Sequence, residues 1–88
     1  MSDIEKFEID TNPALQALFN EVGGSYREFA RVLGVSHSHV WHALNGTRKP
    51  ISVNLLAKYV QEARKKTGLH MVLLINETGK LLYRIERT

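Results

Sequence analysis

The chain has 88 residues, of which 43% are hydrophobic and 24% are charged, and its formal net charge is +3. This length allows one domain with one modest core, and no apolar run approaches the roughly 18 residues that would span a membrane. The chain has no cysteine, which excludes a disulfide framework and a thiolate metal site and is typical of a reducing cytoplasm. Its acidic start has no apolar run behind it, so we expect no secretory signal.

Charge is distributed unevenly along the chain. Residues 1–22 carry five acids and one base, whereas residues 23–66 carry eight bases and two acids. A basic central segment indicates a positive face for a polyanion such as nucleic acid. An ordinary solvated surface would show the same charges, so the charge alone leaves both interpretations open.

The first predicted elements are a short strand and a helix. Alternating apolar and charged residues over 4–9 predict a half-buried strand. Asn12 can cap a helix that follows it. Pro13 suits the first turn of this helix, because the N–H that proline lacks would have no partner there. The pair Gly23-Gly24 predicts the end of this helix.

Two short helices follow closely. Ser25 and Glu28 have the spacing of a capping box, in which each side chain accepts the other's free N–H, and they predict a helix to about Leu33. After a tight turn, Ser36 can cap a third helix over residues 37–45.

A longer helix and a hairpin complete the chain. The fourth helix is predicted between Ser52 and Gly68, and residues 70–87 then change to the period of strands. A three-residue loop with Gly79 in the left-handed conformation would pair six apolar residues on one face of the hairpin. The pairs are Ile75 with Leu81, Leu73 with Tyr83, and Met71 with Ile85.

These elements predict one α+β domain over residues 1–88. We expect an N-terminal strand, four helices, and a C-terminal hairpin that joins the first strand in a small antiparallel sheet.

Residues 26–46 have the pattern of a helix-turn-helix. Ala30 is small enough for a close approach of two helices, Gly34 tolerates the positive φ of the turn, and Val40 lies where the third helix must bury an apolar side chain. Wound at about 100° per residue, the third helix groups uncharged polar and aromatic side chains on the face opposite Val40. They are Ser38, Trp41, His42 and Asn45. Such side chains can contact base edges in the major groove of DNA, and the alternative for Trp41 is packing in the core or at a partner interface.

Basic and polar residues flank this helix and are predicted to contact phosphates, which give affinity and register without sequence information. They are Arg27, Arg31, Thr47, Arg48 and Lys49. Tyr26 is a further candidate for a phosphate contact, for packing, or for both.

The residues Ala30, Gly34-Val35-Ser36 and Val40, followed by Leu44-Asn45-Gly46 and Pro50, resemble the helix-turn-helix of the lambda-repressor-like superfamily. With its first strand and its C-terminal hairpin, the chain resembles the mixed α/β Cro repressors of bacteriophages. The resemblance implies DNA contacts at particular positions: base contacts from His37, Ser38 and His42, and backbone contacts from Arg27, Asn45 and the 47–49 loop. The chain differs in its longer fourth helix, and in Trp41 and several histidines where shorter polar residues are usual.

The second face of the hairpin is too apolar for free exposure in so small a chain. It carries Val72, Leu74 and Leu82 beside Arg84. We expect this face to meet a second copy, and the alternative is that it covers helices of its own chain. Two copies about a two-fold axis would place two recognition helices about 34 Å apart on a palindromic operator.

The resulting hypothesis is a transcriptional repressor of a phage or prophage that binds double-stranded DNA as a homodimer in the cytoplasm of a bacterial host, on the nucleoid. The alternatives are an antitoxin or autoregulator of a two-gene module, and a protein-interaction domain that does not bind DNA. We expect no enzymatic activity, cofactor, membrane contact or small-molecule substrate, because the sequence shows no set of nucleophile, base and orienting residue. We also expect no metal site, because His37, His39 and His42 lie on three different faces of one helix.

Overall fold

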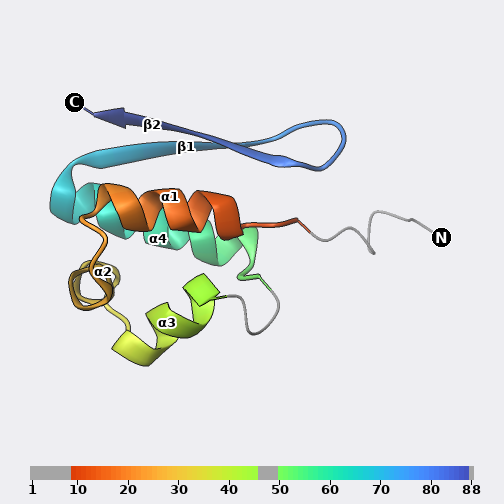
Figure 1. The fold of residues 1–88 in the computed structure, drawn as a ribbon. Coiled ribbons are helices and arrows are strands. Elements are labelled where there is room, and N and C mark those ends of the chain that lie inside the picture. Colours follow the sequence, from red (N-terminus) through yellow and green to blue (C-terminus); the bar gives the residue numbers. More distant parts are fainter. Residues whose placement is uncertain (1–8, 46–49, 88) are drawn as a thin grey trace.

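The structure is a computed structural model that describes residues 9–45 and 50–87. Four helices precede two strands (Figure 1). They are α1 (Asn12–Glu21), α2 (Tyr26–Leu33), α3 (His37–Asn45), α4 (Val53–Thr67), β1 (Leu69–Ile75) and β2 (Leu81–Arg87). The α+β class, the four helices and the two-stranded antiparallel hairpin are therefore confirmed. The strand predicted over 4–9 lies outside the described residues, except for Ile9, which packs against the core.

The elements form three layers. Helices α1 and α4 lie in the middle, the hairpin lies on one side of them, and α2 and α3 lie on the other (Figure 1). The core fills the space between the layers, and its least exposed large side chains include Leu18, Phe29 and Leu56. The hairpin and the α2–α3 pair therefore occupy opposite sides of the domain.

Helix α1 begins differently from the prediction, because Asn12 is its first residue and does not cap it. Thr11 occupies the capping position, but its buried hydroxyl donates to the carbonyl oxygen of Ile51 at 2.7 Å. The N–H of Asn12 donates instead to the carboxylate of Asp10 at 3.0 Å. Helix α1 therefore begins one residue earlier than predicted, and its capping residue, Thr11, makes no side-chain capping bond.

Half of the predicted capping box at α2 is present. The N–H of Glu28 donates to the Ser25 hydroxyl oxygen at 3.3 Å. The carboxylate of Glu28 is paired with Arg31 instead of with the N–H of Ser25, because Arg31 stands one turn further along the same helix. The expected cap of α4 is confirmed, since the N–H of Leu55 donates to the Ser52 hydroxyl oxygen at 3.1 Å.

The register of the hairpin is the predicted one. All three predicted apolar pairs are opposite each other, and Gly79 has the left-handed φ of 83°. The N–H of Asn76 donates to the carbonyl oxygen of Lys80 at 3.0 Å and closes the loop. Leu69, Met71 and Leu81 from one face of the hairpin are buried in the core. The opposite face does not contribute to the core.

Candidate nucleic-acid interface

Helices α2 and α3 meet through the tight turn that the sequence predicts. Gly34 has a left-handed φ of 71°, and the N–H of Val35 donates to the carbonyl oxygen of Ala30 at 3.0 Å. Helix α3 then begins with the N–H of His39 donating to the Ser36 hydroxyl oxygen at 3.1 Å. Val40 of α3 is 2% exposed. The turn and this buried valine together fix which face of α3 points away from the core.

The outward side of α3 carries the predicted polar and aromatic residues, which we call the reading face: Ser38, Trp41, His42 and Asn45. All four are exposed, and Trp41 is 42% exposed. On the opposite side, Ala43 and Leu44 are half-buried beside Val40. The orientation of α3 is thus confirmed, and Trp41 is not a core residue. The contacts of these side chains with DNA remain a prediction.

Contacts among its own residues order the reading face. The rings of Trp41 and His42 meet edge to face, with centroids 5.2 Å apart and an interplanar angle of 88°. The side-chain amide of Asn45 donates to the carbonyl oxygen of Trp41 at 2.8 Å and so satisfies a carbonyl in the last turn of α3. An aromatic pair therefore stands at the centre of this surface, and Asn45 has a structural role at its end.

Tyr26 and His37 connect α2 with the start of α3. The half-buried ring of Tyr26 lies 5.2 Å from that of Phe19 and 5.8 Å from that of His37, between centroids. Of the two roles predicted for Tyr26, packing is therefore present in the structure. His37 is exposed at the first turn of α3, where the positive end of the helix dipole favours an anion.

The predicted phosphate contacts differ in how available their charge is. Arg27 is exposed and has no ion-pair partner within residues 9–45 and 50–87. Arg31 is exposed but paired with Glu28; this bond lowers the pKa of Glu28 and raises the pKa of Arg31. Arg31 would have to leave Glu28 to bind a phosphate. Thr47, Arg48 and Lys49 lie outside the described residues.

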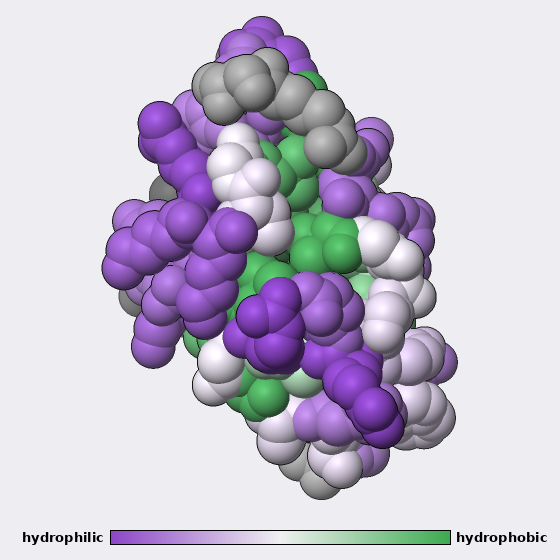
Figure 2. Space-filling model, turned by 90° about the vertical axis from the view of Figure 1, so that its left-hand side faces the viewer, coloured by the Kyte–Doolittle hydropathy of each residue, from purple (hydrophilic) through white to green (hydrophobic). Residues whose placement is uncertain are grey.

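Lys66 lies beside the end of α2, and the sequence did not identify it as a residue of this surface. Its ammonium donates to the carbonyl oxygen of Arg31 at 3.4 Å, so the end of α4 meets the end of α2. Figure 2 shows the left-hand end of the molecule in Figure 1, which α2 and the end of α4 reach; there, hydrophilic side chains surround a narrow apolar strip. The sequence signal was the basic last turn Arg64-Lys65-Lys66, which complements the helix dipole in any case.

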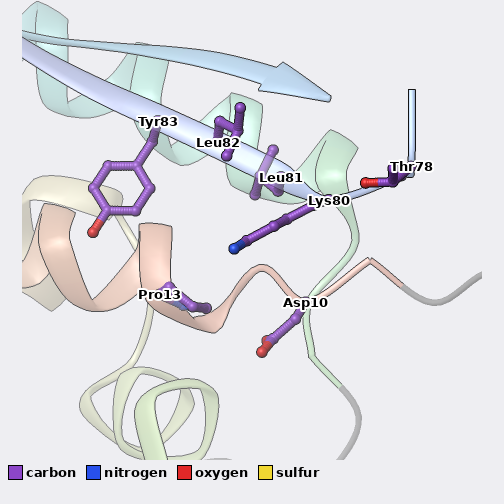
Figure 3. A pocket seen from close by; sticks show the side chains of 8 residues that line it. Asp10, Pro13, Thr78, Lys80, Leu81, Leu82 and Tyr83 are labelled. Carbon is purple, nitrogen blue, oxygen red and sulfur yellow. The ribbon is translucent and has the colours of Figure 1, made fainter. Parts of the chain in front are cut away.

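Other arrangements in the structure have weaker links to function. Among the described residues, no three side chains come together as a metal site, and no helix is long and apolar enough to cross a membrane. A groove of about 610 Å³ lies between the start of α1 and β2 (Figure 3). The amine of Lys80 points into this groove, whereas the carboxylate of Asp10 points away from it (Figure 3). The groove lies beside the hairpin and is separate from the reading face.

Comparison of the chain with protein-family models, with curated proteins and with solved structures found no match. The residues and geometry described above are therefore the basis for assigning a function. Among the arrangements described, the reading face of α3 and its support by α2 point most directly to one function.

Proposed function

We propose that this chain is a sequence-specific double-stranded DNA-binding transcriptional repressor of the phage or prophage Cro type, with a lambda-repressor-like helix-turn-helix core. One observation carries the proposal. Helix α3 exposes an uncharged polar and aromatic face, and α2 holds it in place through the left-handed turn at Gly34. An exposed tryptophan gains no packing on a solvated helix, whereas base edges and thymine methyl groups offer it apolar contacts.

In the proposed complex, α3 enters the major groove. Its N-terminal and outward side chains then read bases, and hydroxyl and imidazole groups supply the hydrogen bonds. The residues are His37, Ser38, Trp41 and His42. Arg27 binds a phosphate beside the groove, and Arg31, Asn45 and the 47–49 loop are further candidates for backbone contacts.

The repressor acts as a homodimer on a palindromic operator, because one reading helix contacts only a few base pairs and a two-fold pair doubles the site. Bound over a promoter in the host cytoplasm, such a dimer would exclude RNA polymerase. This arrangement requires that the reading faces of both copies point toward the same side of the dimer.

The test is selection of duplexes from a random library by the full chain. We expect enrichment of a palindrome with half-sites about one helical turn apart. His42→Ala should then weaken binding of the selected duplex by about 1–3 kcal/mol and leave binding of random duplexes nearly unchanged.

His70→Ala provides a matched control, because it makes the same substitution on β1, which lies across the α1–α4 layer from α3 (Figure 1). It should leave the affinity for the selected duplex unchanged. If the library yields no enriched sequence at low salt, the proposed function is wrong.

A further inference from the structure

The side of the hairpin that faces away from the helices carries an apolar surface. We call it the outer face: His70, Val72 and Leu74 of β1 with Leu82, Arg84 and Glu86 of β2. The register places Leu74 opposite Leu82, and these side chains are 60% and 39% exposed. At the other end His70 lies opposite Glu86, which is also paired with Arg84 at 3.0 Å. The outer face is thus apolar toward the loop and charged toward the strand ends.

The outer face and the reading face point in opposite directions. The hairpin lies on one side of the α1–α4 layer and α3 lies on the other (Figure 1). Val40 turns one side of α3 toward this layer, and Met71 does the same for the hairpin, so the remaining side of each element points outward.

This layer order limits what a contact between two outer faces can do. Packing two outer faces together turns one copy over relative to the other, so the two reading faces point away from each other. A dimer on one palindromic operator needs them on the same side. The operator dimer therefore uses a different contact, and the outer face has a separate role from the one predicted from the sequence.

The outer face is complementary to itself. A two-fold axis parallel to the strands places Leu74 over Leu82 of the second copy, so that apolar side chains cover each other. The same axis places His70 over Glu86 and Arg84 over Val72 of the second copy, so the polar groups gather toward the strand ends of the contact. Each of these pairings between the two copies occurs twice, because the contact is symmetric.

We propose that the outer face joins two DNA-bound units of this chain back to back, so that one assembly holds two duplexes. The inference rests on the proposed function. Six residues on each copy are far fewer than the about 20–30 per side of a standard stable interface, so the contact alone is weak and depends on concentration. Units bound to neighbouring sites on one DNA molecule have a high effective concentration, which favours a loop between those sites.

The first experiment measures association of the full chain without DNA by sedimentation velocity. Leu74→Lys and Leu82→Lys each place a charge in the apolar part of the contact, and two-fold symmetry makes this charge occur twice. We expect at least about a tenfold loss in the association constant of one step. Ile75→Lys is the matched control, because Ile75 is adjacent in β1, is 44% exposed, and lies on the opposite face of the hairpin. Equal association constants for the wild type and all three variants would overturn the proposal.

The second experiment measures bridging with the duplex obtained from library selection. One copy of the duplex is fixed to beads and a fluorescent copy is free in solution, and the protein is added. We expect the wild type and Ile75→Lys to retain the fluorescent duplex on the beads, and Leu74→Lys to bind duplex normally but retain little. If the wild type binds the bead-bound duplex yet retains no second duplex, bridging is wrong while the proposed function stands. If no duplex is bound at all, the proposed function fails, and bridging fails with it.

Discussion

His39 of α3 and Tyr59 of α4 share a hydrogen bond between the imidazole Nε2 and the phenol oxygen, and their rings meet edge to face with centroids 6.1 Å apart. Tyr59 is 3% exposed and belongs to the core. The bond therefore connects α3 with the middle layer of the domain. We infer that it limits rotation of α3 about its own axis and so sets the direction of the reading face.

Tyr59→Phe removes this hydrogen bond and keeps the ring. We expect the free energy of unfolding to fall by about 0.5–1.5 kcal/mol, the usual net contribution of one hydrogen bond. Chemical denaturation measures the change. Tyr83→Phe is the control, because Tyr83 is 43% exposed on β2. Equal losses in the two variants would contradict a specific role for the His39–Tyr59 bond.

The stability of the protein should decrease at alkaline pH partly through Tyr59. Burial raises the pKa of Tyr59, so the folded chain keeps this proton at a pH where the unfolded chain loses it. The stabilisation is complete below the pKa of an unfolded tyrosine, about 10, and is lost as the pH rises above it. Unfolding measured at several alkaline pH values should therefore show a smaller loss in Tyr59→Phe than in the wild type. Parallel pH profiles would contradict this assignment.

Glu28→Gln should strengthen binding to random duplexes. The substitution removes the carboxylate that holds Arg31 and leaves the guanidinium available for a phosphate. We also expect the slope of log K for duplex binding against log salt concentration to become steeper by about 0.9, the value for one additional phosphate contact. Fluorescence anisotropy of a labelled duplex at several salt concentrations measures the slope.

Glu62→Gln provides the control for this prediction, because it removes the same charge from α4. Its effect on the salt slope should be smaller. If the two variants gain affinity equally, net charge explains the gain and the Arg31 contact does not.

Gly34→Ala should impair both stability and DNA binding. The backbone at Gly34 is left-handed at φ 71°, and no atom beyond its chain neighbours lies within 4 Å of an added Cβ, so backbone strain is the main cost. That cost is about 1–2 kcal/mol for a residue with a side chain. Gly68→Ala, at φ 76°, carries the same strain beyond α4 and serves as the control. Thermal denaturation should show similar losses, whereas only Gly34→Ala should weaken duplex binding; equal affinities would contradict the role of this turn.

Local patterns predicted the fold where local interactions decide it. The hairpin register followed from the apolar pairs and from Gly79, because a shift by one residue would turn every apolar side chain to the other face. The orientation of α3 followed from Val40 and the helical period.

The errors arose where a contact distant in sequence, or a competing neighbour, changed a local preference. Thr11 takes the capping position of α1 and binds the carbonyl oxygen of Ile51, whereas Asn12 is the first residue inside the helix. Arg31 competes for the carboxylate of Glu28, so the capping box is incomplete. The His39–Tyr59 bond joins two helices whose packing no local pattern specifies. The separation of the outer face from the reading face likewise required the order of the layers.

Trp41 permits the most direct measurement of the central claim, because it is the only tryptophan in the chain and lies on the reading face. If α3 enters the major groove, titration with the selected duplex should shift or quench Trp41 emission in a saturable way, and high salt should reverse the change. The midpoint should match that of anisotropy measured on a labelled duplex. A duplex that binds by anisotropy while Trp41 emission stays constant would show that the protein contacts DNA through another surface.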